Sequence, residues 1–124
     1  MKKIYYLGTC STCASILAET GISKHPGKLG FDMQDIKTEK ISPAQIDEMK
    51  SMAGSYEALF SRRALKYKEL GLKDKNLSEK DYRRFILEEY TFLKRPVVII
   101  GKEIFIGSEK KNVAALKSAV MPLK

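Results

Sequence analysis

Cys10 and Cys13 are the only cysteines of the chain, and they stand where a predicted strand gives way to a predicted helix. The apolar run over residues 4–7 predicts a strand, Gly8 ends it, and residues 11–20 predict a short helix. A thiol at a helix start lies beside unpaired backbone N–H groups and the positive end of the helix dipole, which favour the thiolate. A thiol about one turn later can attack a mixed disulfide at the first. The spacing predicts thiol–disulfide chemistry.

The same two cysteines have two simpler interpretations. They could form half of a zinc site, but no second cysteine pair exists, and the single histidine, His25, cannot complete a tetrahedral ligand set. They could also be ordinary buried thiols, since free cysteine is among the most buried residue types. The small polar neighbours Thr9, Ser11 and Thr12 argue against that interpretation, and Thr9 or Ser11 could cap the helix. We expect no metal and a redox role.

Length and charge narrow the class of protein further. A chain of 124 residues fits one domain, and no apolar run approaches the ~20 residues of a membrane span. The N-terminal apolar stretch is short and is needed for the first strand, so we expect no signal peptide and a cytoplasmic location. The net charge of +8 suits an anionic partner, such as an oxyanion or the carboxylates of glutathione. Because the lysines are scattered, we expect neither a membrane contact nor direct nucleic-acid binding.

The middle of the chain predicts three helical segments, over residues 42–54, over residues 56–72 and from Ser78 onward. The first begins with Ser42 as N-cap, Pro43 at the first helical position and Gln45 three residues after the cap. The second carries apolar residues at helical spacing, interrupted at residues 61–63. The aromatic residues of this part are expected in the core rather than at a cofactor.

Strands flank this helical part. Residues 31–36 alternate and predict a second strand, and the β-branched run Val97–Ile100 predicts a buried central strand that pairs with residues 103–106 as a hairpin. A last helix follows, with Ser108 as its cap. This order predicts an α/β fold with the mixed sheet of thioredoxin and glutaredoxin, as a single domain over residues 1–124 with a helical insertion at about 42–92. In such folds the proline before the penultimate strand, here Pro96, is typically cis and lies beside the cysteines, but the sequence does not decide the isomer.

The chain resembles, over essentially its whole length, the arsenate reductase (ArsC), Spx and YffB group of thioredoxin-like proteins. Three blocks carry the resemblance: the Cys10 motif, Phe60-Ser61-Arg62-Arg63 followed by Tyr67-Lys68-Glu69-Leu70-Gly71-Leu72, and Leu93-Lys94-Arg95-Pro96-Val97-Val98. The resemblance implies that Cys10 is the nucleophile and Cys13 the resolving thiol. It also implies that Arg63 and Arg95 bind an anionic substrate and that Pro96 shapes the site. Arg63 matches the basic residue of the Spx and YffB branches better than that of the reductases.

The function implied is that of a thiol–disulfide oxidoreductase without a bound cofactor, reduced by glutathione or glutaredoxin. Its substrate would be arsenate or a glutathione-linked disulfide. Three positions depart from the arsenate reductases: Ile106-Gly107 replaces a third arginine, Ala14 a basic residue, and Cys13 a serine. An oxyanion pocket with fewer cations should bind arsenate weakly.

The alternative that the resemblance implies is a redox-sensing transcriptional regulator of the Spx type, which docks onto the C-terminal domain of the RNA polymerase α-subunit. Gly54 lies near the place of a glycine that matters for that docking. A glycine that ends a helix needs no partner to explain it, however.

Overall fold

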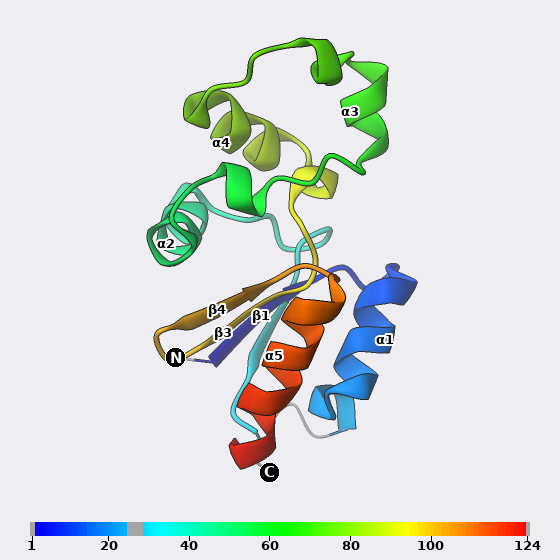
Figure 1. The fold of residues 1–124 in the computed structure, drawn as a ribbon, viewed down its shortest axis with the longest axis vertical. Coiled ribbons are helices and arrows are strands. Elements are labelled where there is room, and N and C mark those ends of the chain that lie inside the picture. The colour runs from blue at the N-terminus through cyan, green and yellow to red at the C-terminus, as the bar shows by residue number, and fades with distance from the viewer. Residues whose placement is uncertain (1, 25–28, 124) are drawn as a thin grey trace. The chain divides into compact units, whose positions relative to one another are not determined.

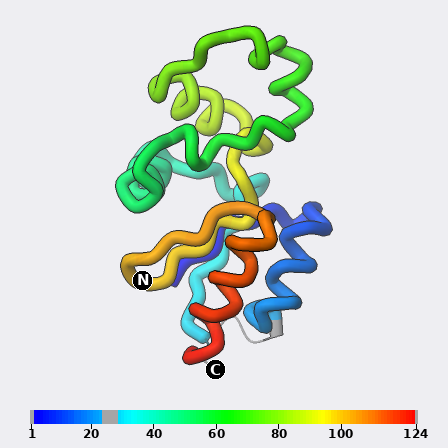
Figure 2. Tube along the Cα trace, in the orientation of Figure 1, coloured from blue at the N-terminus to red at the C-terminus, as the bar shows by residue number. Residues whose placement is uncertain are grey.

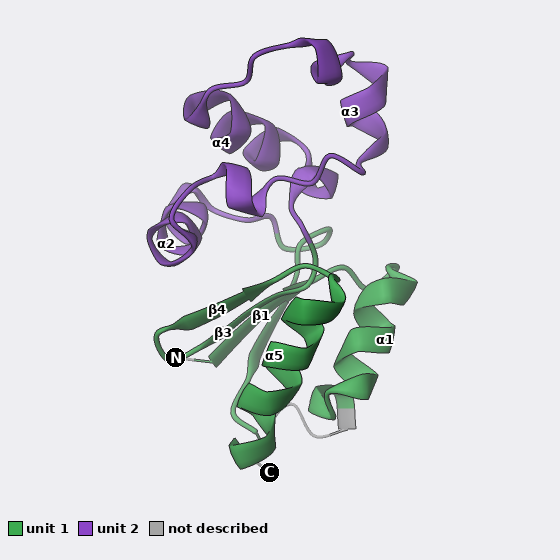
Figure 3. Cartoon of the chain, in the orientation of Figure 1, with its two compact units in different colours: residues 1–39, 95–124 green, residues 40–94 purple. Residues whose placement is uncertain are grey.

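A computed structural model describes residues 2–24 and 29–123, so the prediction that involved His25 lies outside the described residues. The chain forms two compact units, one of residues 1–39 and 95–124 and the other of residues 40–94 (Figure 3). Each unit has its own buried side chains and is described by itself.

The first unit contains a four-stranded mixed sheet in the order β2-β1-β3-β4, with strands β1 (Lys2–Tyr6), β2 (Asp32–Asp35), β3 (Val97–Ile100) and β4 (Glu103–Ile106). β1 pairs in parallel with β2 and antiparallel with β3, and β3 and β4 form the predicted hairpin. Val97, Val98 and Ile99 are fully buried, as predicted for a central strand. The predicted mixed sheet is therefore confirmed.

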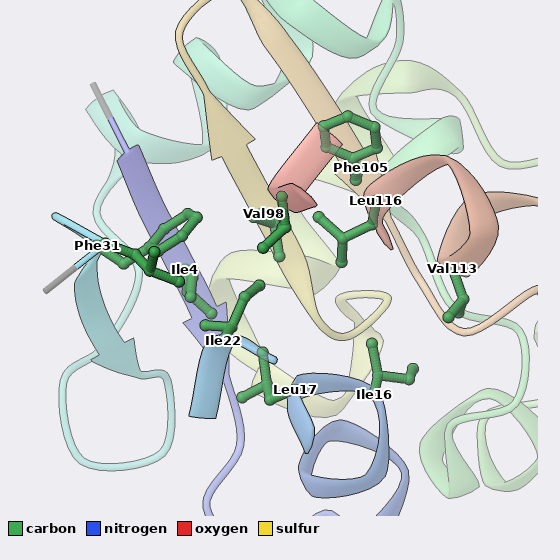
Figure 4. Close-up of a cluster of buried hydrophobic side chains, with 11 residues drawn as sticks. Ile4, Ile16, Leu17, Ile22, Phe31, Val98, Phe105, Val113 and Leu116 are labelled. Atoms are coloured by element: carbon green, nitrogen blue, oxygen red, sulfur yellow. The ribbon is translucent and has the colours of Figure 1, made fainter. Parts of the chain in front are cut away.

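Helices α1 (Ser11–Glu19) and α5 (Lys110–Val120) lie side by side over one face of this sheet (Figures 1 and 2). Their apolar side chains, among them Ile16 and Leu116, form a buried cluster with Ile4 and Val98 of the sheet (Figure 4). Each large aliphatic side chain buried in this way contributes roughly 1.5–3 kcal/mol. A helix of nine residues is marginal alone, so this packing holds α1 and the residue before it in place.

The second unit contains helices α2 (Pro43–Ala53), α3 (Leu65–Glu69) and α4 (Glu79–Glu88). The predicted capping box is present: Ser42 Oγ accepts the Gln45 N–H at 3.1 Å, and Gln45 Oε1 accepts the Ser42 N–H at 3.1 Å. Gly54 ends α2 with a φ of 97°, in the left-handed region that favours glycine. In the part of the chain that the structure describes, no helix is long and apolar enough to cross a membrane.

The helical segment predicted over residues 56–72 is interrupted at residues 61–63 as expected, but its helical extent was wrong: it forms a 3-10 turn at Glu57–Leu59, the short α3 and the start of a second 3-10 turn at Leu72–Asp74. Phe60 is extended between them and stacks on Phe92, with ring centroids 5.0 Å apart. The backbone at Ser61 donates to the Phe92 carbonyl at 2.7 Å. Burial of the Phe60 ring and this backbone pairing draw the chain out of a helix at the point where the two arginines follow.

The predicted cap of the last helix was also wrong. Glu109, not Ser108, is the N-cap of α5, and its side chain makes no capping hydrogen bond. The loop is held instead by Asn112, whose Oδ1 accepts the Ile106 N–H at 3.1 Å and whose Nδ2 donates to the Gly107 carbonyl at 2.8 Å. A side chain inside the helix thus fixes the turn that enters it.

Candidate active site at the start of α1

Cys10 is itself the N-cap of α1, in place of the predicted Thr9 or Ser11. Its Sγ accepts the backbone N–H of Cys13 at 3.5 Å, and its carbonyl accepts the N–H of Ala14 at 3.2 Å. A sulfur in this position points at the unpaired N–H groups of the first turn, where a negative charge is stabilised.

The environment of Cys10 favours its thiolate. Partial burial of Cys10 raises its pKa, but hydrogen bonds from the Cys13 backbone and side chain lower it, as do the hydrogen bond and the charge of Arg95. The net result is a pKa of Cys10 below the ordinary thiol value. A partly exposed thiol with a lowered pKa is the kind that reacts with disulfides and electrophiles.

Cys13 has the opposite character. Its side chain is only 1% exposed, and this burial, together with the hydrogen bond and charge of Cys10, raises the pKa of Cys13 to about 11. Both cysteines are free thiols in the structure. The pair is therefore asymmetric, with one reactive thiol facing solvent and one protonated thiol behind it.

Arg95 and Pro96 reach this site through the pairing of β1 with β3. Tyr5 near the C-terminal end of β1 is opposite Val97 at the start of β3. The residues that precede β3 therefore lie at the same end of the sheet as the loop that leads from β1 to Cys10. The Arg95–Pro96 peptide bond is cis, which the sequence left open. Pro96 is buried, and its carbonyl accepts the Gly107 N–H at 2.9 Å.

Arg63 belongs to the second unit, so its place beside the cysteines stays a prediction. Its neighbour Arg62 is engaged within that unit, where Nη2 donates to Glu57 Oε2 at 2.8 Å and to the Tyr82 hydroxyl at 3.2 Å. The exposed Arg63 guanidinium has no hydrogen bond or ion pair to any residue that the structure describes. Of the two arginines, Arg63 is the one left available for an anion.

Asp35 is a residue that the sequence analysis missed. Its Oδ2 accepts the Gly8 N–H at 3.2 Å and its Oδ1 accepts the Lys37 N–H at 3.0 Å, so the carboxylate holds the loop that leads into Cys10. A Cβ added to Gly8 would lie 2.6 Å from Asp35 Oδ2. One signal could have found it. Residues 31–36 were predicted to form a strand, Asp35 lies at the end of that strand, and two parallel neighbouring strands end on the same side of the sheet.

We expect Gly8→Ala to displace this loop, because the new methyl group overlaps the Asp35 carboxylate. Overpacking of this kind typically costs about 1–3 kcal/mol, and a displaced Cys10 should alkylate more slowly at pH 7. Iodoacetamide kinetics and urea unfolding measure the two effects. Asp35→Ala removes the overlap, so the cost of Gly8→Ala should shrink in that background and persist in Asp35→Asn. Equal costs in all three backgrounds would contradict the assignment.

Metal-binding side chains do not gather in the part of the chain described: no group of three His, Cys, Asp or Glu residues there could hold an ion. The groups assembled at the start of α1 are two thiols of opposite character, a guanidinium and a helix N-terminus.

Comparison with known proteins gives a consistent picture. The model of the ArsC family matches residues 5–116. An arsenate reductase from Vibrio cholerae is 20% identical with a TM-score of 0.73, over 93% of this chain and 96% of that one. The YffB protein PA3664 is 21% identical with a TM-score of 0.74, over 94% and 98%. SACOL0876 from Staphylococcus aureus COL is 25% identical with a TM-score of 0.67, over 93% and 97%. No curated protein matches the sequence.

Proposed function

The chain belongs to the ArsC family, and from this we propose that it is a thiol–disulfide oxidoreductase in which Cys10 is the attacking thiolate. The observation that carries the proposal is the placement of the Cys10 sulfur, which caps α1, accepts the Cys13 N–H at 3.5 Å and is hydrogen-bonded by Arg95. Solvent exposure gives a substrate access to it. We place the reaction in the cytoplasm, where disulfides are kept reduced.

In the first step the Cys10 thiolate attacks one sulfur of a disulfide, forms a mixed disulfide and releases the other sulfur as a thiolate. Cys13 then attacks the Cys10 sulfur, the substrate thiolate leaves and takes up a proton, and a Cys10–Cys13 disulfide remains. Burial is the main cause of the raised pKa of Cys13 and persists through the first step, but the added contribution of the Cys10 charge vanishes once Cys10 is in a mixed disulfide. A backbone hydrogen bond at Leu7 and the charge of Arg95 still favour the Cys13 thiolate. The pKa of Cys13 is thus lower after the first step, when its thiolate is needed for resolution, than before it.

Arg95 and Arg63 are the proposed anion-binding groups, because guanidinium forks bind oxyanions and carboxylates. Arsenate would be reduced by two thiols, giving arsenite, a disulfide and water. The segment Ile106-Gly107 offers no cation, and its backbone N–H groups already bond Asn112 and Pro96. We therefore propose a disulfide, such as a glutathione-linked one, as the better substrate and arsenate as a weak one. Glutathione or glutaredoxin is the proposed reductant.

The test is NADPH consumption by the pure protein, coupled through glutathione, glutaredoxin and glutathione reductase, with a glutathione-linked disulfide or arsenate as substrate. We expect turnover of the disulfide that is lost in Cys10→Ser and little turnover of arsenate. An equal rate of NADPH consumption with and without the protein would overturn the enzymatic function. Efficient arsenate turnover would instead show that the missing cation at Ile106-Gly107 is tolerated.

A regulator that docks on RNA polymerase is the second candidate, and Gly54 is the observation that favours it. Gly54 is exposed, and a Cβ there would meet no atom within 4 Å, so this end of α2 has an open surface. Gly54→Arg should then abolish binding to the polymerase α-subunit. Gly54→Asn is the control, because asparagine tolerates the left-handed backbone that Gly54 adopts at a φ of 97°.

A further inference from the structure

A surface groove of about 800 Å³ lies between α1 and α5 in the first unit. Both helices start at the same end and run in the same direction, so the groove begins at Ser11, directly after Cys10, and follows α1 to Glu19 (Figure 1). Its floor includes the buried Ile16 and Val113. The groove is thus a channel on the surface that starts at the residue after the proposed nucleophile.

The walls of the groove carry three charged groups. Lys110 lies at the Cys10 end and Lys117 at the far end, and Glu19 is the single acidic group. All three are exposed, and within the described part of the chain none of them has an ion pair or a hydrogen bond through its side chain. Two unpaired cations against one anion make the groove complementary to a ligand with more carboxylates than ammonium groups.

Geometry sets the size of that ligand. Lys110 and Lys117 are seven residues apart on α5, which places them about two turns or ~10 Å apart along the helix. The nine residues of α1 cover about 13 Å. An extended peptide advances about 3.3–3.6 Å per residue, so roughly four residues span the groove and their acidic side chains can reach both lysines.

We propose that this groove binds an acidic, extended segment of a protein whose cysteine exchanges disulfides with Cys10. The proposal rests on the function proposed above and names the substrate class of the same site. The reacting cysteine of the segment lies at the Ser11 end, where the Ser11 and Ser108 hydroxyls can bond its backbone. The Cys10 thiolate attacks the cysteine sulfur, an S–S bond forms, and the former partner of that sulfur leaves as a thiolate with the electron pair.

The experiment uses mixed disulfides that share one leaving group, thionitrobenzoate, whose release is followed by absorbance. The thiol of interest is a blocked acidic pentapeptide with a terminal cysteine and two aspartates. The three comparison thiols are the same peptide with lysines in place of the aspartates, glutathione, and mercaptoethanol. The reduced protein is mixed with each at ~0.15 M salt, where steering by the net charge is largely screened. We expect the acidic peptide to react about tenfold faster than the other three.

Two matched pairs of variants locate the effect. The quantity compared is the rate with the acidic peptide divided by the rate with mercaptoethanol. Lys110→Glu should lower this ratio about tenfold, whereas Lys111→Glu, which makes the same change of charge outside the groove, should leave it unchanged. Ala114→Trp fills the groove and should lower the ratio, whereas Ala115→Trp, an exposed neighbour that does not line the groove, should keep it.

Three results overturn the proposal: glutathione reacting as fast as the acidic peptide, equal effects of Lys110→Glu and Lys111→Glu, or no effect of Ala114→Trp. Glutathione reacting as fast as the acidic peptide would assign the groove to a tripeptide. Equal effects of the two lysine substitutions would show that the preference for the acidic peptide comes from the net charge of the protein. Failure of the proposed function gives a different result. In that case even the mixed disulfide of mercaptoethanol and thionitrobenzoate releases no thionitrobenzoate in a reaction that depends on Cys10.

Discussion

Replacing Cys10 with serine is expected to abolish disulfide exchange, with a loss of roughly a thousandfold or more in the rate of the first step. The hydroxyl of serine stays protonated where the Cys10 thiol ionises, so the helix N-terminus and Arg95 have no anion to stabilise. The measurement is the single-turnover release of thionitrobenzoate at pH 7. Thermal unfolding should change little, because serine can also cap a helix.

Cys13→Ser is the matched control, since it removes the other thiol of the pair. Because Cys13 is protonated and buried, the variant should keep the first step but accumulate a stable mixed disulfide at Cys10. Peptide mapping after mild peroxide treatment should find a Cys10–Cys13 disulfide in the wild type only. Loss of the first step in Cys13→Ser, with Cys10→Ser still active, would reverse the assigned roles.

Arg95→Met is expected to raise the pKa of Cys10 and to slow its alkylation roughly tenfold at any pH below that pKa, the scale of the ~1.5 kcal/mol typical of a hydrogen bond to a charged group. The sign follows from the chemistry: Arg95 favours the thiolate, so without it a higher pH is needed for the same thiolate fraction. The measurement is the rate of iodoacetamide alkylation of Cys10 against pH. The midpoint of the profile should move upward in the variant.

The high-pH plateau separates this effect from damage to the fold. Once Cys10 is fully ionised, Arg95→Met and the wild type should alkylate at similar rates, since only the thiolate fraction differs. Lys94→Met removes the same charge one residue earlier and should leave the midpoint where it is. An unchanged midpoint in Arg95→Met would show that Arg95 has no part in the reactivity of Cys10, which would then depend on the Cys13 hydrogen bonds and the helix N-terminus.

The sequence by itself determined the elements whose causes are local. The junction of strand and helix at Cys10 follows from hydrophobic pattern, as does the buried strand β3. The capping box at Ser42 and the end of α2 at Gly54 are encoded within a few residues of each boundary. The order of these elements along the chain predicted the mixed sheet, and the sequence blocks around Cys10, Phe60 and Arg95 carried the family resemblance. The reactive motif itself is contiguous, so it could be found without a structure.

Only the tertiary structure decided which distant groups meet at that motif. Arg95 contacts Cys10 because β3 pairs with β1, and Asp35 holds Gly8 because β2 lies on the other side of β1. Similarly, the sequence favoured Arg63 over Arg62 only through the family resemblance, whereas the structure shows that the Arg62 side chain bonds Glu57 and a tyrosine of α4 and that, among the described residues, the Arg63 side chain bonds none. Contacts between residues far apart in the chain depend on strand register and side-chain packing, which local periodicity does not encode.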